Sequence, residues 1–280
     1  MEKIIIKLFI RFRLHDLFPK IASFLAKGRM DPFFFIIGFQ KSGTTSLYEQ
    51  IMELPIFKKG IAKEVSEMSK KSPNKSHFKL FFPKKNGKFK TGNACHLDIY
   101  SPFGALNIKE HFPHSKLIVI MRNPTERAYS HFLMDKKFGW IGDKVSFNDY
   151  IDFELKILEK IDTENIFDLY NNTKWLNFPF GMPVGKGIYY TYIKNLIDNN
   201  INFHPICLEN YNQNFEIEFN KLISYLDVED VDISKIEIKY SNKSKIESHM
   251  TDNSRDRLKE FYETYNDKLF DLLGVEYPWN

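Results

Sequence analysis

The chain has 280 residues, of which 43% are hydrophobic, 27% charged and 16% aromatic, and this suits one large globular domain or a domain with an appendage. Two cysteines exclude a disulfide framework, and no internal repeat is present. The formal net charge of +4 arises in residues 1–30, which carry a net +5, so the other 250 residues sum to −1. The basic pI is therefore no argument for a nucleic-acid-binding domain, and we expect no nucleic-acid partner.

Residues 1–30 are predicted to form a basic helical segment, separate from a domain over residues 31–280. An apolar run at residues 4–10 is interrupted by Lys7 and is too short to cross a bilayer. Further along, four apolar residues share one helical face: Leu17, Ile21, Phe24 and Leu25. Two interpretations stay open, a helix packed on the main domain and a basic amphipathic helix at a membrane surface.

A strand, a glycine-containing loop and a helix are predicted over residues 33–54. Phe33 to Ile37 is a short apolar run that Gly38 ends, and Leu47, Ile51 and Leu54 recur at near-helical spacing. In this arrangement, backbone N–H groups and the helix dipole favour an anion at the helix N-terminus. The sequence therefore predicts a phosphate-binding loop.

The loop itself reads Gly-Phe-Gln-Lys-Ser-Gly-Thr-Thr-Ser over residues 38–46. A nucleoside-triphosphate loop places its lysine after the second glycine, whereas Lys41 precedes Gly43. The loop resembles the one with which sulfotransferases bind the 5′-phosphosulfate end of 3′-phosphoadenylyl sulfate (PAPS). The resemblance implies that Lys41 neutralises the leaving oxygen and that the loop residues hold the 5′-phosphate: Ser42, Gly43, Thr44, Thr45 and Ser46.

A lysine-rich stretch, residues 58–90, holds eleven lysines and two glutamates, and is either a solvated face or a path for an anionic acceptor. Within it, Lys63-Glu64 resembles the Lys-Glu pair of the heparan-sulfate-type sulfotransferases, which implies Glu64 as general base; a surface carboxylate paired with Lys63 is the alternative. Aromatic residues usually follow this pair in that family, but Ser66, Glu67 and Met68 follow here. His96 ends a family-like strand and is a second candidate base, because cytosolic sulfotransferases use histidine; a purely structural role stays open.

A second strand–turn–helix motif spans residues 116–130. Leu117 to Met121 is continuously apolar, as in a strand covered on both faces. Asn123 is placed to cap the next helix, with Glu126 at the position of a capping-box partner. The motif closely resembles the 3′-phosphate-binding motif of sulfotransferases, which implies Arg122 and Ser130 as ligands; helical spacing puts Ser130 on the face of Asn123 and Arg127.

The remaining elements are predicted in chain order as helix 146–161, an irregular lid or acceptor-side loop 163–185, helix 185–196, strand 203–208, helix 215–226 and helix 254–273. Helix 185–196 resembles the family's Gly-x-Tyr helix, so Tyr189 either lines the cofactor site or packs in the core. Relatives close a basic loop over the adenine and 3′-phosphate. This implies the same role for Lys243 and Lys245, with a solvated linker as the alternative.

This order predicts an α/β fold, a P-loop-like three-layer sandwich with a mainly parallel sheet and helices on both faces, whose ligands bind beyond the carboxyl ends of the strands. The resemblance implies sulfuryl transfer from PAPS, leaving PAP, to an acceptor hydroxyl or amine on a carbohydrate, with no metal required. Alternatives are a P-loop kinase or NTPase, an inactive PAPS- or PAP-binding module, and a membrane-surface scaffold. Cysteine usage favours the cytoplasm, with membrane-surface association and a lumenal location left open.

Overall fold

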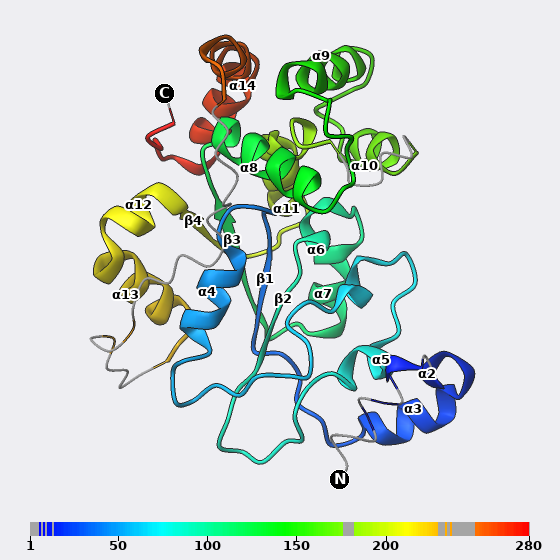
Figure 1. Ribbon diagram of the computed structural model, residues 1–280. Coiled ribbons are helices and arrows are strands. Elements are labelled where there is room, and N and C mark those ends of the chain that lie inside the picture. The colour runs from blue at the N-terminus through cyan, green and yellow to red at the C-terminus, as the bar shows by residue number, and fades with distance from the viewer. Residues whose placement is uncertain are drawn as a thin grey trace.

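The computed structural model describes residues 14–175, 182–228 and 250–279, together with residues 6, 8, 10–12, 233 and 236 (Figure 1). The four strands are β1 (Phe34–Gly38), β2 (Gly92–Ala94), β3 (Lys116–Met121) and β4 (Phe203–Cys207). The α-helices are α2 (Leu14–Leu17), α3 (Pro19–Ala26), α4 (Thr44–Ile51), α5 (Lys75–Lys79), α6 (Leu97–Tyr100), α7 (Gly104–His111), α8 (Pro124–Lys137), α9 (Phe147–Leu158), α10 (Ile166–Trp175), α11 (Tyr189–Asp198), α12 (Leu208–Gln213), α13 (Phe215–Tyr225) and α14 (Asp252–Leu273). Two short 3₁₀ helices, η1 (Ser66–Ser69) and η2 (Gly185–Gly187), complete the set.

The strands form one parallel sheet in the order β2-β1-β3-β4. Phe34 of β1 lies opposite Gly92 of β2 and Lys116 of β3, and Leu117 of β3 lies opposite Phe203 of β4. Every residue of β1 is buried, as a strand covered on both faces requires. The predicted parallel sheet is confirmed.

Two hydrophobic layers cover the sheet because successive side chains of a strand point to opposite faces. Phe34 and Ile36 pack with residues of α4 and α13, whereas Phe35 and Ile37 pack with residues of α7, α8 and α11. Figure 1 shows α4, α12 and α13 on one side of the sheet and α6 and α7 on the other. The predicted three-layer α/β sandwich is therefore confirmed.

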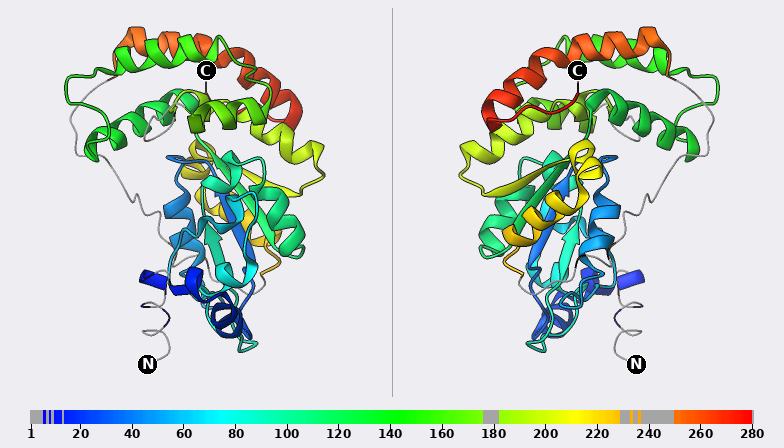
Figure 2. Two further views of the ribbon diagram at one scale, coloured as in Figure 1. Left: turned by 90° about the vertical axis from the view of Figure 1, so that its right-hand side faces the viewer. Right: turned by 90° about the vertical axis from the view of Figure 1, so that its left-hand side faces the viewer.

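A second group of helices lies beyond the carboxyl ends of the strands. Figure 2 shows α8, α9 and α14 as a layer across that end, and α14 contacts both α8 and α11. The prediction of an irregular loop over residues 163–185 is wrong for residues 166–175, which form α10. Ile166 and Leu169 are buried three residues apart, so packing against the core stabilises a helix that an Asn-rich composition does not favour. Residues 176–181 of the predicted loop lie outside the described residues.

The N-terminal segment packs on the domain through small side chains. Ala22 and Ala26 of α3 bury against Leu80. Of the four residues predicted to share a helical face, only Leu25 joins this cluster, while Leu17, Ile21 and Phe24 are exposed. The interpretation of a helix packed on the main domain is therefore confirmed for α3, but the contact uses the shorter alanines, which allow a closer approach, and leaves three of the four residues exposed. None of the helices in the described ranges has the length and apolar character needed to cross a membrane.

Candidate active site

A cleft of about 850 Å³ opens at the carboxyl ends of β1 and β3. Both predicted anion-binding motifs contribute to its wall. Nine of the residues predicted as site residues line it: Lys41, Gly43, Thr44, Thr45, Ser46, Glu64, His96, Arg122 and Ser130. Ser42 and Tyr189 are buried behind the wall, and Lys243 and Lys245 lie outside the described residues.

The first loop turns sharply into α4. Lys41 and Gly43 have φ angles of 68° and 94°, in the left-handed region, and a Cβ on Gly43 would lie 3.1 Å from Leu208 Cδ1. The Leu47 N–H donates to the Gly43 carbonyl, which starts the helix at Thr44. Within the described residues, no side chain caps this N-terminus. The first turn of α4 thus presents an uncapped helix end to the cleft, as an anion site requires.

Two cations converge on this end of the cleft. Burial lowers the pKa of the Lys41 ammonium, and the positive charge of Arg122 lowers it further. Neither Lys41 nor Arg122 has an ion-pair partner among the residues that the structure describes. Two uncompensated positive charges in a shared cleft favour a ligand with more than one negative group.

Glu64 is held beside the first loop by its neighbours. Lys63 Nζ lies 2.7 Å from Glu64 Oε1 and donates a 2.7 Å hydrogen bond to Thr45 Oγ1. The Asn93 side chain accepts from the Val65 N–H and donates to the Val65 carbonyl, which fixes the segment to β2. Glu64 is therefore both paired with Lys63, as the alternative interpretation expected, and part of the cleft.

His96 lies at the start of α6 and lines the same region of the cleft. Burial lowers its pKa to about 4, and the charge of Lys186 acts in the same direction while Glu64 opposes it. The imidazole is therefore neutral at pH 7 and has a nitrogen able to accept a proton. Its role as a second candidate base stays a prediction.

The second motif places Arg122 directly after β3 and Asn123 at the N-cap of α8. The Asn123 side-chain oxygen accepts from the N–H groups of Thr125 and Glu126, so the predicted cap is confirmed. The predicted capping box is wrong, because the Asn123 N–H donates to Glu209 Oε1 at 2.9 Å and Glu126 pairs with Arg255 of α14.

Glu209 is a residue of the site that the sequence interpretation missed. Besides the Asn123 N–H, it accepts a 3.0 Å hydrogen bond from Trp279 Nε1, and Asn123 in turn donates to the Trp279 carbonyl. The available signal was its position, since Glu209 follows β4 at the sheet edge where β1 and β3 also end. It ties the chain's C-terminal region to the turn that carries Arg122.

Tyr189 also acts from behind this turn. Its buried hydroxyl donates a 2.7 Å hydrogen bond to the Arg122 carbonyl. Tyr189 does not line the cleft, and the structure instead places it among the aromatic residues of the core, beside Phe39 and Trp279. It holds the backbone from which the Arg122 side chain extends.

The cleft face of α8 is formed by Glu126, Ser130, Leu133 and Met134. Arg127 is fully buried on the other side of the helix and donates to the carbonyls of Gln40 and Pro183. Ser130 therefore shares its face with Glu126, at i and i+4, and not with Arg127.

The family model for the sulfotransferase domain matches residues 31–229 of this sequence. The chain belongs to the sulfotransferase family. The structure is similar to that of a sulfotransferase from Alicyclobacillus acidocaldarius, with 18% identity, a TM-score of 0.67, and 89% of this chain and 98% of that chain covered. It is less similar to the sulfotransferase domain of the olefin synthase of Synechococcus PCC 7002, with 10% identity, a TM-score of 0.44, and coverage of 84% and 95%. No curated protein sequence matches the chain.

Behind Lys41, this sulfotransferase buries further ionisable side chains. Asp135 is fully buried, its oxygens accept no hydrogen bond from the described residues, and burial raises its pKa to about 7. Lys186 lies over the Tyr100 ring and has its pKa lowered to about 8 by burial and by the charge of Arg127. The sequence interpretation missed both. The charge of Asp135 raises the pKa of Lys41, against the larger lowering effects of burial and Arg122.

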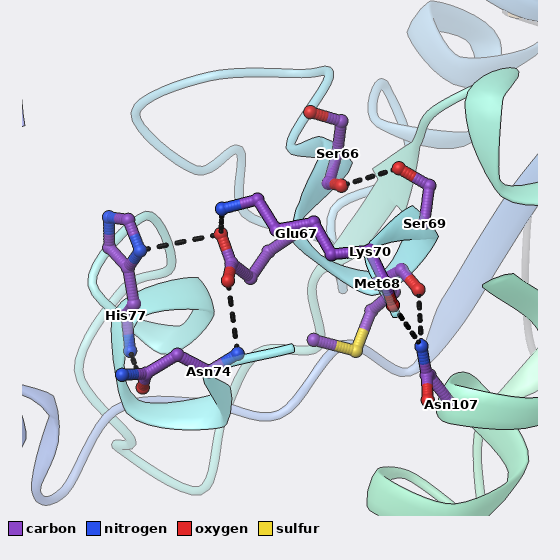
Figure 3. Close-up of polar contacts among 8 residues, drawn as sticks. All are labelled: Ser66, Glu67, Met68, Ser69, Lys70, Asn74, His77 and Asn107. Carbon is purple, nitrogen blue, oxygen red and sulfur yellow. Dashed lines mark hydrogen bonds and ion pairs between the residues drawn. The ribbon is translucent and has the colours of Figure 1, made fainter. Parts of the chain in front are cut away.

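The segment after Glu64 is organised by a buried carboxylate, that of Glu67. Glu67 accepts from the Asn74 N–H at 3.0 Å and lies 2.5 Å from Lys70 Nζ and 3.3 Å from His77 Nδ1 (Figure 3). Burial by itself would raise the pKa of Glu67, but the bonds from His77, Lys70 and Asn74 lower it to about 2. Glu67 is therefore a structural anion and no candidate base.

No group of three His, Cys, Asp or Glu side chains in the described part of the sulfotransferase is placed to hold a metal ion.

Proposed function

We propose that this sulfotransferase moves a sulfuryl group from PAPS to an acceptor hydroxyl or amine and releases PAP. The observation that carries the proposal is the presence of two unpaired cations, Lys41 and Arg122, at two strand ends in one cleft. Each lies close to a helix N-terminus, that of α4 or α8. PAPS has two separate anionic ends, a 5′-phosphosulfate and a 3′-phosphate, whereas ATP has no 3′-phosphate.

In this proposal the first loop binds the 5′ end of the donor. Lys41 and the first turn of α4, with the hydroxyl groups of Thr44 and Thr45, hold the phosphosulfate. Arg122 and Ser130 hold the 3′-phosphate, and Tyr189 positions the Arg122 backbone. We expect Lys243 and Lys245 to cover the adenine and the 3′-phosphate.

The reaction requires stabilisation of the negative charge on the leaving oxygen and a base that takes the acceptor proton. The acceptor oxygen or nitrogen forms a bond to sulfur, the bond from sulfur to the bridging phosphate oxygen breaks, and its electron pair stays on that oxygen. Lys41 stabilises the developing negative charge. Glu64 takes the acceptor proton, a role worth roughly 10²–10⁴-fold in rate. The scheme uses no metal.

We propose a carbohydrate acceptor of the heparan-sulfate type. Glu64 supports this choice, because the Lys63-Glu64 pair lies beside the first loop. The same region of chain carries exposed lysines that suit an anionic glycan: Lys58, Lys59, Lys70, Lys71 and Lys75. Under this proposal, acceptor and donor meet between Glu64 and Lys41.

Calorimetric titration with PAP, in parallel with ATP plus magnesium, tests the donor assignment. We expect micromolar PAP binding to the wild type and at least about tenfold weaker binding to Arg122→Ala, because a hydrogen bond to a charged group contributes roughly 1.5–3 kcal/mol. Arg257→Ala is the matched control, since Arg257 pairs with Asp152 away from the cleft. Magnesium-dependent ATP binding without PAP binding would favour the kinase alternative instead.

An inactive PAP-binding module is distinguished by turnover. A chain that binds PAP but transfers no sulfuryl group to any glycan, phenol or amine acceptor tested would leave binding as its function. Transfer that Glu64→Gln abolishes would establish the enzyme.

A further inference from the structure

The N-terminal segment turns its large apolar side chains outward. Leu17 is 70% exposed, Phe24 71% and Phe12 64%. Three more large apolar residues of the same stretch of sequence are exposed, and we call the set of six the N-terminal apolar surface: Leu8, Phe12, Leu17, Phe18, Ile21 and Phe24. These six lie within 17 residues of chain, while the other ten large hydrophobic residues exposed in the described part are spread from Phe89 to Val275. Single exposed apolar residues are ordinary, but such a group marks an interaction site.

The packing of α3 explains why this surface is left uncovered. The helix meets the domain through Ala22, Leu25 and Ala26, which pack with Leu80, whereas its other large side chains, Ile21 and Phe24, are exposed. The contact is fixed by backbone bonds next to it, from Met30 N–H to the Pro83 carbonyl and from Lys85 N–H to the Gly28 carbonyl. Covering the apolar surface by turning α3 over would break this contact.

Exposed cations accompany the apolar side chains. Arg11, Lys20 and Lys27 are exposed, and none has an ion-pair partner within the described ranges. The segment that pairs with the end of α3 carries two further exposed lysines, Lys84 and Lys85. Lys85 Nζ lies 3.5 Å from Asp31 Oδ2. Apolar side chains interleaved with exposed cations are the pattern of helices that lie at an anionic membrane surface.

We propose that the N-terminal apolar surface docks on an anionic lipid bilayer. The apolar side chains enter the boundary between headgroups and acyl chains, and Arg11, Lys20 and Lys27 meet lipid phosphates. An apolar contact alone would suit a second copy of the chain equally, but two copies related by a twofold axis would bring the same cations together. The charge therefore favours the bilayer.

This placement sets the direction of the catalytic cleft. Met30 leads into the amino end of β1, whereas the cleft lies beyond the carboxyl end of β1. A five-residue strand separates these two ends by about 16 Å. Figure 2 shows α2 and α3 at one end of the molecule and the layer of α8, α9 and α14 at the other. A docked protein thus opens its cleft toward the aqueous phase, and an acceptor reaches it from there.

Vesicle sedimentation with the full chain tests the proposal. We expect binding to phosphatidylcholine vesicles with about 30 mol% phosphatidylglycerol, and much less to phosphatidylcholine alone. Leu17→Ser/Phe24→Ser should weaken binding at least about 100-fold, since each buried apolar side chain contributes about tenfold or more. Ile217→Ser, which changes a side chain 60% exposed on α13, is the matched control and should bind as the wild type does.

Charge-reversal variants provide a second test in the same vesicle experiment. Lys20→Glu/Lys27→Glu should weaken binding by about 25-fold or more, since each cation near an anionic surface contributes about fivefold. PAP titration verifies that each variant is folded. Failure of the wild type to bind anionic vesicles, or equal binding to both vesicle types, would overturn the proposal. So would self-association in light scattering that Leu17→Ser/Phe24→Ser abolishes without any vesicle binding.

Discussion

The side chains that reach the cleft take their positions from residues that do not. Arg122 extends from a turn held by Tyr189 on its carbonyl and by Glu209 on the next N–H. Glu64 is adjacent to Val65, whose backbone is bonded twice by Asn93. The local motif therefore supplies the chemical groups, and distant residues supply their direction.

At this scale the base assignment can be tested. Glu64→Gln should lower kcat by roughly 10²–10⁴-fold while PAP affinity changes little, because the amide cannot take the acceptor proton. Steady-state kinetics and PAP titration measure the two effects. His96→Ala is the companion variant. If its kcat falls as far while Glu64→Gln remains active, the histidine is the base, and the neutral imidazole at pH 7 is consistent with that role.

At the scale of elements, the site depends on segments between the regular strands and helices. Glu67 links η1 to α5, and Asn107 of α7 donates to the carbonyls of Met68 and Lys70. These bonds hold the chain that follows Glu64 against the domain. A loss of order here would move the side of the cleft that carries Glu64 and leave the side that carries Lys41 and Arg122 in place.

Glu67→Gln tests this element. The folded pKa of Glu67, about 2, is below its ordinary value of 4.5, so the carboxylate contributes stability above pH 4.5 that is lost as the pH falls toward 2. We expect the variant to unfold about 1–3 kcal/mol more easily in urea at pH 7, and the difference to shrink at pH 3. Glu263→Gln, at an exposed position of α14, should change stability at neither pH. A pH-independent loss for Glu67→Gln would contradict the ionic role.

At the scale of the whole molecule, the protein places uncompensated charge inside and around its cleft. Lys41 lies within the field of the Arg122 cation, and the buried carboxyl group of Asp135 acts on both Lys41 and Lys186. Such an arrangement favours an anionic ligand at the expense of stability in its absence. Binding of the donor should therefore stabilise the whole fold.

Asp135→Asn tests the cost of this buried charge. The folded pKa of Asp135, about 7, exceeds its ordinary value of 3.8, so burial favours the neutral acid and wild-type stability falls as the pH rises from about 4 through 7. We expect the variant to be more stable than the wild type at pH 8, by more than about 1 kcal/mol, and close to it at pH 4. Urea unfolding at both pH values measures this, with exposed Asp256→Asn as control. Equal stability at pH 8 would mean that Asp135 is compensated when ionised.

The amino-acid sequence alone determined the parallel α/β sandwich, the first loop and the Arg122–Ser130 motif. These features depend on apolar periodicity and on residues within one strand–turn–helix unit, where neighbours in sequence are neighbours in space. Only the tertiary structure decided which distant groups join them. Glu209 carries no signal beyond its position after β4, and Lys186 and Asp135 carry none, because the charged groups that act on them lie mainly in other elements. Periodicity likewise showed that Leu17, Ile21 and Phe24 share a face, but whether that face points inward depends on the small side chains that pack against Leu80.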